Sequence, residues 1–421
     1  MEYKYRFADD ILKNKLQSKG AVLVEGAKWC GKSTTSARIA NTVIYMQDPA
    51  TKERNFWLAT SNTNLFFSGK TPILIDEWQL VPSIWDSVRF EVDKRGLFGQ
   101  FILTGSATPP NTDQIFHSGV GRITKLTMRP MSLFESKDSN GSVLLSDLFL
   151  QKQIYEKSML NIHDIAFLTC RGGWPLSLND DKKIALAQAI DYYDGVVNMD
   201  INKVDGIKRK KETAELLLRS YARNISTQVS LQTILADMQF ADYTFSPNTI
   251  SSYLEALKKI FVIEESLSWN PNLRSKAAIR TSNTRYFTDP SIACAALGLG
   301  PENLINDLNT FGLIFENLCI RDLRVYAEVN DGTVYHYRDK TGLECDAVVA
   351  LRNGKYGLIE IKLGGPKQVE EGAKNLNKLE SLIDDTRMEK PSFKMVLTAI
   401  DDIAYQRQDK VYVVPIGCLS A

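Results

Sequence analysis

The chain has 421 residues, 44% of them hydrophobic and 24% charged, and this length predicts two or three domains, each with its own core. Its 51 basic and 50 acidic residues leave a net charge of +1, so any nucleic-acid site has to come from local segments. The six cysteines occur singly and no apolar segment reaches the length of a signal peptide or a membrane span, so we expect a cytoplasmic protein with reduced thiols and no membrane contact.

Short β-rich runs alternate with helical stretches from Phe7 to Glu135. The runs are AVLVE, TVIYM, PILID and QFILTG, at residues 21–25, 42–46, 72–76 and 100–105. This alternation is typical of a parallel sheet flanked by helices. A polar, turn-rich segment follows, and we place a boundary in it, which predicts an α/β domain at residues 1–138.

Residues 26–33, GAKWCGKS, fit the phosphate-binding loop pattern between the first β-run and a helical stretch. In such a loop the glycines let backbone amides curl around the phosphates, the lysine reaches the β and γ oxygens, and the hydroxyl ligates Mg²⁺. These roles fall on Gly26 and Gly31, on Lys32, and on Ser33. Further nucleotide contacts are expected from Ala27, Lys28, Trp29, Cys30 and Thr34. A glycine turn that merely caps a helix is the alternative, and the flanking elements disfavour it.

The later run PILIDEWQ ends in two adjacent carboxylates, Asp76 and Glu77. A P-loop enzyme needs one carboxylate to hold Mg²⁺ through water and another to polarise the attacking water. We expect Asp76 to serve the metal and Glu77 to be the catalytic base. The alternative is an acidic pair that caps a strand at the surface.

The run QFILTGSA predicts another buried strand, whose polar end would lie beside the γ-phosphate. That end carries Thr104 and Ser106; an ordinary turn at Gly105 is the alternative. Beyond it, Arg122 is a candidate for stabilising charge in the transition state, because arginine is the usual residue in that role. It would act within its own chain or on a neighbouring copy in a homo-oligomer, and an exposed structural arginine is the alternative.

Residues 139–300 are predicted to form a helical and winged-helix region. The stretch 144–205 reads as helices interrupted by RGGWP. Three short helices and two β-like runs follow, at residues 212–224, 231–238, 248–260, 261–268 and 285–288. This is the winged-helix order, in which the third helix is the one that enters a major groove.

Two basic features occur in this region, one before the first of these three helices and one at the end of the third. One is the run KVDGIKRKKE at residues 203–212, and the other is the pair Lys258 and Lys259. Basic residues beside a helix-turn-helix neutralise phosphates, which makes DNA one expected partner. A solvated charged face or a protein contact is the alternative.

Residues 301–421 follow an α-β-β-β-α-β-β order. Asp346 lies on the second β-run, and Glu360 and Lys362, two positions apart on the third, project to one face of the sheet. Carboxylates from adjacent strands plus a lysine suit a magnesium-dependent phosphodiester hydrolase, with Asp346 and Glu360 binding metal and Lys362 orienting or activating water. Glu316, on the preceding helix, is a fourth candidate. The alternative is a surface ion pair between Glu360 and Lys362.

Several motifs together resemble one known family. GAKWCGKST, LIDEWQ, ILTGSA, HSGVGRI and RPMSLFE look like the prokaryotic AAA-type P-loop ATPases fused to a C-terminal domain of unknown function, and RGGWP, FTDP, FENL, HYRDKTGLECD and IEIK resemble the rest of that family. The resemblance spans nearly the whole chain. It implies ATP binding and hydrolysis, a middle helical and winged-helix region, and a C-terminal nuclease-like fold. Asp346, Glu360 and Lys362 match the PD-(D/E)xK nuclease core, although Cys345 stands in place of the proline.

The sequence therefore predicts an α/β protein with an N-terminal AAA-type P-loop domain, a middle winged-helix region and a restriction-nuclease-like C-terminal domain. We expect ATP and Mg²⁺ as ligands and hydrolysis coupled to an action on DNA. The alternative is an ATP-controlled switch or interaction protein whose C-terminal domain is an inactive binding module. A sequence-specific transcription regulator is a third class, which no tandem promoter-reading motif supports.

Overall fold

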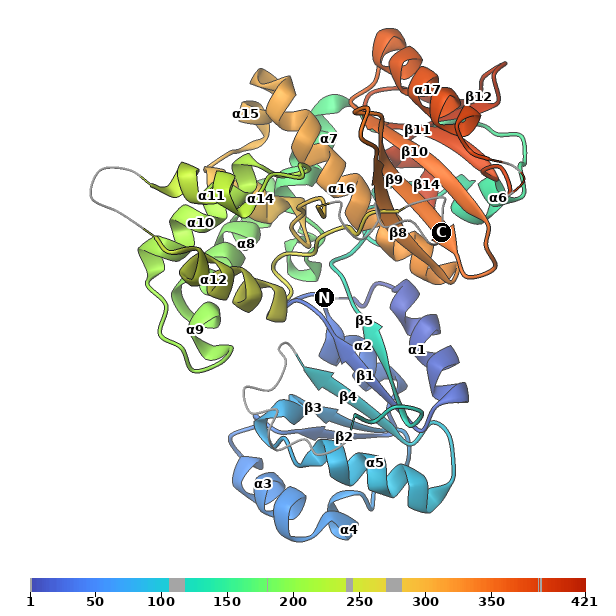
Figure 1. Cartoon of the computed structure of the whole chain (residues 1–421). Coiled ribbons are helices and arrows are strands. Elements are labelled where there is room, and N and C mark those ends of the chain that lie inside the picture. The colour runs from blue at the N-terminus through green and yellow to red at the C-terminus, as the bar shows by residue number, and fades with distance from the viewer. Residues whose placement is uncertain are drawn as a thin grey trace. The chain divides into compact units, whose positions relative to one another are not determined.

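The computed structural model describes residues 2–105, 118–179, 181–239, 245–269, 282–384, 386 and 388–421 (Figure 1). The chain divides into two compact units. The first comprises Met1–Pro130, Gly195–Lys210 and Ser252–Val262, and the second comprises Met131–Asp194, Lys211–Ser251 and Ile263–Ala421. This division differs from the predicted borders, because two segments of the middle region pack with the N-terminal unit rather than with their sequence neighbours.

The first unit is built on a parallel sheet, as predicted. In the described part of the chain its five strands lie in the order β2-β3-β4-β1-β5, and each neighbouring pair is parallel. Their bounds are β1 (Ala21–Glu25), β2 (Thr42–Tyr45), β3 (Ile73–Asp76), β4 (Phe101–Gly105) and β5 (Ile123–Thr127). The strands β3 and β4 are buried along their whole length, which explains their continuous apolar sequence.

Helices cover both faces of this sheet (Figure 1). They are α1 (Phe7–Ser18), α2 (Lys32–Ile39), α3 (Lys52–Ser61), α4 (Thr63–Phe66), the 3₁₀ helix η1 (Trp78–Leu80) and α5 (Ile84–Arg95). One apolar cluster includes Trp78, Trp85 and Phe101, and another includes Leu12 and Val22. Because all the strands point the same way, the segments that follow β1, β3 and β4 meet at one edge, where open α/β sheets bind ligands.

The second unit contains a mixed sheet near the C-terminus. In the described residues its order is β7-β12-β13-β11-β10-β9-β8. The strands are β7 (Tyr155–Lys157), β8 (Gly332–Arg338), β9 (Glu344–Leu351), β10 (Tyr356–Lys362), β11 (Phe393–Thr398), β12 (Ile403–Gln406) and β13 (Val411–Pro415), with the helices α16 (Leu308–Val329) and α17 (Pro366–Ser381). A small pair joins β6 (Val143–Leu144) to β14 (Leu419–Ser420).

Two of these strands correct the helical interpretation of residues 144–205. The strand β7 is exposed along its length and pairs with β12 at the edge of the sheet, and β6 pairs with the last strand of the chain. A three-residue edge strand has too little alternation to be recognised by period, and its partner lies more than two hundred residues away. The segment therefore completes the C-terminal sheet.

The remaining helices are short. They are α6 (Leu145–Phe149), α7 (Ile162–Arg171), η3 (Pro175–Ser177), α8 (Lys182–Gly195), the π-helical turn η4 (Val196–Asp200), α9 (Ile201–Lys203), α10 (Lys211–Arg223), α11 (Leu231–Met238), α12 (Pro247–Lys259), α14 (Pro290–Leu297), α15 (Pro301–Asn306) and η5 (Ile416–Cys418). Two antiparallel bridges, Ile263 with Phe287 and Ser266 with Thr284, follow α10, α11 and α12. Among the described helices, none combines the length and apolar character that crossing a bilayer requires.

The helix α12 has the predicted apolar face. Ile250, Tyr253, Leu254, Leu257 and Ile260 are all buried. The Ser246 hydroxyl accepts a hydrogen bond from the Thr249 amide at 3.1 Å, which caps the start of the helix as the Ser-Pro pair predicts. The order of three helices and an antiparallel pair is thus present, and the winged-helix assignment stays a prediction.

Candidate active site

The P-loop connects β1 to α2 and needs glycine at both ends. Gly26 has φ +148°, and a Cβ added there would lie 2.0 Å from the Met128 carbonyl oxygen. Gly31 has φ +101° and immediately precedes α2. A side chain at Gly26 would collide with the backbone just beyond β5, and the conformation of Gly31 is one that L-residues rarely adopt. The loop therefore curves as the sequence predicts.

Lys32 lies within that curve. It is buried, and its Nζ donates hydrogen bonds to the carbonyl oxygens of Gly26 at 3.0 Å and Ala27 at 2.7 Å. Since Lys32 is also the first residue of α2, the positive end of that helix faces the same space. A cation and the positive end of a helix thus converge where an anion would bind.

Arg6 supports the loop from outside. Its guanidinium is buried and donates to the Cys30 carbonyl at 2.8 Å and to the Arg129 carbonyl at 2.8 Å. Sequence reasoning missed this residue, because a lone arginine before the first helix carries no motif. It joins the P-loop to the segment after β5 and so holds the loop in place.

Ser33, Asp76 and Thr104 come together behind the loop. The hydroxyl groups of Ser33 and Thr104 both donate to Asp76 Oδ1, at 2.5 and 2.6 Å. Asp76 is buried at the end of β3, and its register partner on β4 is Thr104. A serine hydroxyl beside a carboxylate is an oxygen donor set that suits Mg²⁺, so these residues fit the expected metal. Ser106, the other predicted polar residue, lies outside the described residues.

Glu77 follows Asp76 in an unusual backbone conformation. Its φ of 58° and ψ of 47° lie in the left-handed region, which is uncommon for a non-glycine residue. Burial raises the pKa of its carboxyl, Asp76 adds to that rise, and Lys32 opposes it. Its carboxylate accepts a hydrogen bond from the Gln79 side chain. The structure thus brings the predicted base to the P-loop with a partner that the sequence analysis did not single out.

Lys28 and Trp29 occupy the outer side of the loop. Lys28 forms an ion pair with Asp200 at the end of η4, a segment that belongs to the same compact unit. Trp29 has φ 63° and is 43% exposed. Both side chains are therefore accessible from solvent, unlike that of Lys32.

Arg122 does not join these residues. It precedes β5, its carbonyl accepts a hydrogen bond from the first amide of β1 at 3.1 Å, and its exposed side chain donates to Asp93 at 2.8 Å. The P-loop follows the other end of β1. Because β1 and β5 are parallel, Arg122 lies at the opposite edge of the sheet from Lys32. The structure therefore supports no contact between Arg122 and a phosphate group at the P-loop of the same chain.

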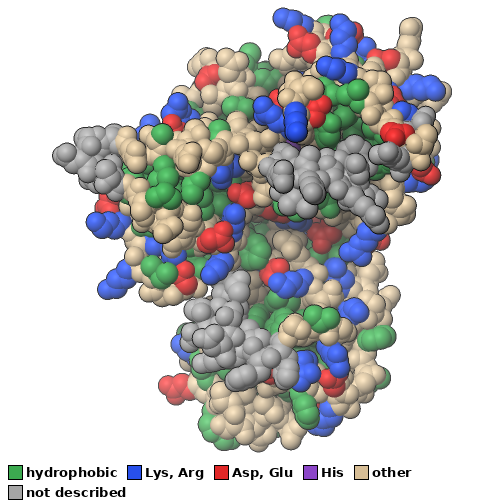
Figure 2. All heavy atoms as spheres, viewed as in Figure 1, with side chains coloured by type: hydrophobic (Ala, Val, Ile, Leu, Met, Phe, Trp, Pro, Cys, Tyr) green, Lys and Arg blue, Asp and Glu red, His purple; other side chains and the backbone are tan. Residues whose placement is uncertain are grey.

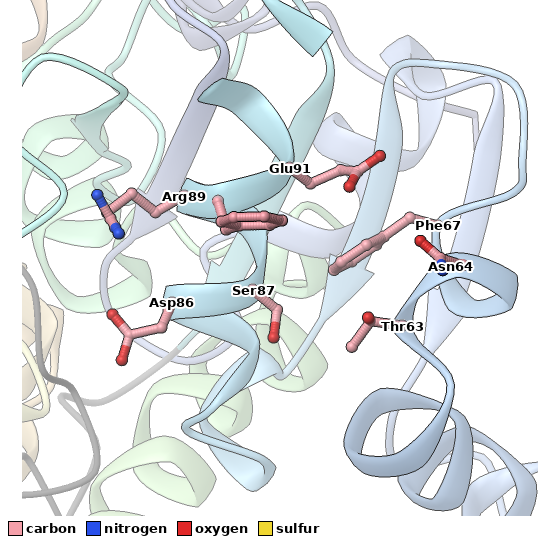
Figure 3. Close-up of a pocket in the computed structure, with 8 residues that line it drawn as sticks. Thr63, Asn64, Phe67, Asp86, Ser87, Arg89 and Glu91 are labelled. Atoms are coloured by element: carbon pink, nitrogen blue, oxygen red, sulfur yellow. The ribbon is translucent and has the colours of Figure 1, made fainter. Parts of the chain in front are cut away.

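A separate pocket of about 420 Å³ lies between α4 and α5 (Figure 3). In Figure 3, Thr63, Asn64 and Phe67 face Ser87 and Glu91 on α5 across this pocket. None of the residues that line it belongs to the predicted site. It has no part in the site described above.

The C-terminal unit brings together the second predicted set. Lys362 Nζ lies 2.7 Å from Glu360 Oε2 and 3.3 Å from Asp346 Oδ2, and the Ile361 amide donates to Asp346 at 2.7 Å. Glu360 is only 2% exposed. Burial raises the pKa of Glu360 to about 8, with Asp346 adding to the rise and Lys362 opposing it. The two strands therefore place all three side chains on one face, as predicted.

Glu316 lies on α16 beside this cluster. It accepts a hydrogen bond from the buried Tyr286 hydroxyl at 2.5 Å, and burial, reinforced by Asp346, raises its pKa well above the usual range. Glu316, Tyr286 and Asp346 line a pocket of about 290 Å³. Within the described residues, however, no group of three or more His, Cys, Asp or Glu is arranged to hold a metal. The Lys362 ammonium lies between the two strand carboxylates, so as they stand they do not form a metal site.

The basic run of the middle region is only partly exposed. Arg209 is buried and binds both carboxylate oxygens of Asp205, at 2.7 and 2.8 Å. Lys208 and Lys210 remain at the surface. On the face shown in Figure 2, the Lys and Arg side chains of the described residues are dispersed among acidic ones. One of the expected phosphate contacts is thus a structural residue, and DNA binding stays a prediction.

Three segments of the chain match models of protein families. Residues 18–137 match an AAA domain, residues 162–303 match a domain of unknown function (DUF8612), and residues 311–419 match another domain of unknown function (DUF4143). No curated protein matches the chain.

Among solved structures, the Walker-type ATPase PABY2304 of Pyrococcus abyssi is similar over 70% of this chain and 98% of that one, with 16% identity and a TM-score of 0.43. A TM-score this low supports no inference about function. The family match over residues 18–137, together with the parallel sheet and the P-loop geometry, supports an AAA-type P-loop ATPase domain in this part of the chain.

Proposed function

We propose that this chain binds ATP with Mg²⁺ at its P-loop and hydrolyses it. The observation that carries this proposal is the convergence of Lys32, Ser33, Asp76 and Glu77 at the carboxyl edge of one parallel sheet. Each supplies a group that phosphoanhydride hydrolysis requires. The match of residues 18–137 to an AAA domain is independent support.

The proposed roles follow from the contacts. Lys32 would exchange its loop carbonyls for the β and γ phosphate oxygens, and Ser33 and Asp76 would hold Mg²⁺. The metal, when bound, neutralises charge on the phosphates. Glu77 accepts a proton from the attacking water, and its raised pKa makes it a stronger base than an exposed glutamate once it is ionised.

The experiment that tests this proposal is steady-state ATP hydrolysis by wild type and Glu77→Gln. The variant keeps the size of the side chain and removes the base, so we expect a loss of about 10²-fold or more in kcat. The matched control is Glu53→Gln, an exposed glutamate on α3 of the same unit, which should hydrolyse ATP like wild type. Equal rates for Glu77→Gln and wild type would contradict the assigned base.

We further propose that hydrolysis is coupled to DNA through the region of α10, α11 and α12. Its support is the order of three helices and an antiparallel pair, with exposed lysines nearby. Duplex DNA should raise the ATPase rate, and added salt should reverse the effect because phosphate contacts release counterions. If DNA does not change the rate of ATP hydrolysis, the alternative of an ATP-controlled switch or interaction protein is favoured.

A second candidate function is metal-dependent cleavage of nucleic acid at the C-terminal cluster. Its support is that Glu316 and Asp346 line one pocket, and that Lys362 pairs with both Asp346 and Glu360. Binding a metal there would require Lys362 to leave the carboxylates. The test compares Mn²⁺ binding and DNA cleavage for wild type, Asp346→Asn and the control Asp331→Asn, which changes an exposed turn. Absence of both activities in wild type would leave the inactive binding module as the better account.

A further inference from the structure

Gln79 lies against the candidate base and is the last residue of the LIDEWQ motif, to which the sequence analysis gave no role of its own. It is a half-buried residue of η1, two positions after Glu77. Its Nε2 donates a hydrogen bond to Glu77 Oε2. Its Oε1 is buried and has no hydrogen-bond partner in the part of the chain that the structure describes. An ionised carboxylate accepts but cannot donate, so the amide nitrogen must be the atom that faces Glu77.

The end of β4 leaves room for this carboxamide. A Cβ added to Gly105 would lie 2.7 Å from Gln79 Oε1 and 3.3 Å from Trp78 Nε1. The backbone of Gly105 is not in the left-handed region, so alanine would be compatible with its conformation. A methyl group at position 105 would therefore push against the Gln79 carboxamide and crowd Trp78, so the carboxamide occupies space that glycine leaves open.

The turn that carries Glu77 and Gln79 is well anchored. The Leu80 amide donates to the Glu77 carbonyl at 3.1 Å, and Trp78 is buried against Trp85 with ring centroids 5.2 Å apart. This anchoring keeps Glu77 in its left-handed conformation and turns Gln79 back onto its carboxylate. The contact between the two side chains is thus set by the turn itself.

The charges around Glu77 explain why a neutral partner matters. Lys32 and Lys28 attract the carboxylate, and Asp76 repels it. A carboxylate free to rotate would pair with one of the two ammonium groups, because a charged hydrogen bond is stronger than a neutral one. A glutamate whose carboxylate is paired with an ammonium group points away from the attacking water and is a weaker base.

We propose that Gln79 is the positioning residue of the hydrolytic base. It holds one carboxylate oxygen of Glu77, which leaves the other directed at the attacking water, and Gly105 provides the space in which it does so. This inference rests on the proposed function of Glu77. Gln79 acts through Glu77, and its removal should lower kcat while leaving ATP binding intact.

The test is a double-mutant cycle on the full-length chain. Gln79→Met keeps the length of the side chain and removes the donor, and we expect kcat to fall about tenfold or more, with KM for ATP within about twofold. In the Glu77→Gln background the same change should cause no further loss in the residual hydrolysis, followed under single-turnover conditions. The control is Gln100→Met, which changes a buried glutamine immediately before β4 that hydrogen-bonds Phe98 and Arg95.

A second variant reaches the same contact without altering Gln79. Gly105→Ala should displace the carboxamide and lower kcat as Gln79→Met does, and it should add no loss when Gln79 is already methionine. Equal losses from Gln79→Met in the wild-type and Glu77→Gln backgrounds, or a raised KM with unchanged kcat, would overturn the proposal. Full activity in Glu77→Gln alone would instead overturn the proposed function, so the two failures are distinguishable.

Discussion

Two sites in this chain combine carboxylates with a lysine, and the ammonium group lies in a different place in each. At the P-loop, Lys32 donates to backbone carbonyls, and Asp76 accepts hydrogen bonds from the neutral hydroxyls of Ser33 and Thr104. In the C-terminal cluster, Lys362 itself lies between Asp346 and Glu360.

The difference has an electrostatic consequence. A lysine whose donors are taken up by backbone oxygens keeps its positive charge available to an anion, and the nearby carboxylates stay available to a cation. A lysine between two carboxylates offsets one of their negative charges and so weakens the attraction for any added cation. In the first unit, the charges of lysine, aspartate and glutamate are therefore available to a ligand. In the second unit, the lysine lies between the aspartate and the glutamate and partly neutralises them.

The largest effect should come from Lys32→Met. With no counter-charge at the loop, we expect ATP hydrolysis to fall by about 10²-fold or more, because the phosphate oxygens lose their main cation. Lys125→Met is the control, since this lysine is largely exposed on β5 of the same unit. Equal ATPase rates in Lys32→Met and Lys125→Met would contradict the claim that the charge of Lys32 is available to an anion at the P-loop.

Lys362→Met should act on stability rather than on ATP hydrolysis. It leaves Asp346 and Glu360 without their counterion, and we expect the free energy of unfolding of the second unit to fall by about 1–3 kcal/mol, less than for a fully buried pair because Lys362 is partly exposed. Urea denaturation measures the change, and adding Glu360→Gln should restore part of the loss. An unchanged midpoint would mean that Lys362 does not neutralise the cluster.

The pH dependence of the C-terminal unit should reflect Glu360. Because the pKa of this group is raised to about 8 in the folded protein, the native state binds more protons than the unfolded chain between its ordinary pKa and that value. Stability should therefore fall as the pH rises through this window. Glu360→Gln should flatten the dependence in urea titrations at several pH values, whereas Glu53→Gln should not; a slope that survives the Glu360 change would assign it to another group.

The smallest effect should come from Arg122→Ala. Its ion pair with Asp93 is exposed to solvent and contributes little to stability, and its edge of the sheet lies away from the P-loop. Hydrolysis at low protein concentration should stay within about twofold of wild type. A loss that appears only as the protein concentration rises would instead show Arg122 acting on a neighbouring copy in a homo-oligomer.

Much of the nucleotide site could be predicted because it is encoded locally. Gly26, Lys32 and Ser33 belong to one short loop between a strand and a helix, and Asp76 and Glu77 end a recognisable apolar run. The hydrogen bonds of Thr104 and Gln79 could not be predicted. The hydrogen bond of Thr104 depends on the register of two strands. The hydrogen bond of Gln79 depends on a left-handed turn at Glu77, and a sequence without glycine there does not predict such a turn.

What the sequence alone determined is the parallel sheet, the P-loop with its two carboxylates, and the common face of Glu360 and Lys362, because helix, strand and loop periods act over a few residues. Only the tertiary structure decided that Arg122 lies at the far edge and that Lys362 neutralises its own cluster. It also decided that β7 joins a sheet formed by distant strands. These outcomes depend on which strands pair and in which direction, and residues far apart in the chain set that choice together.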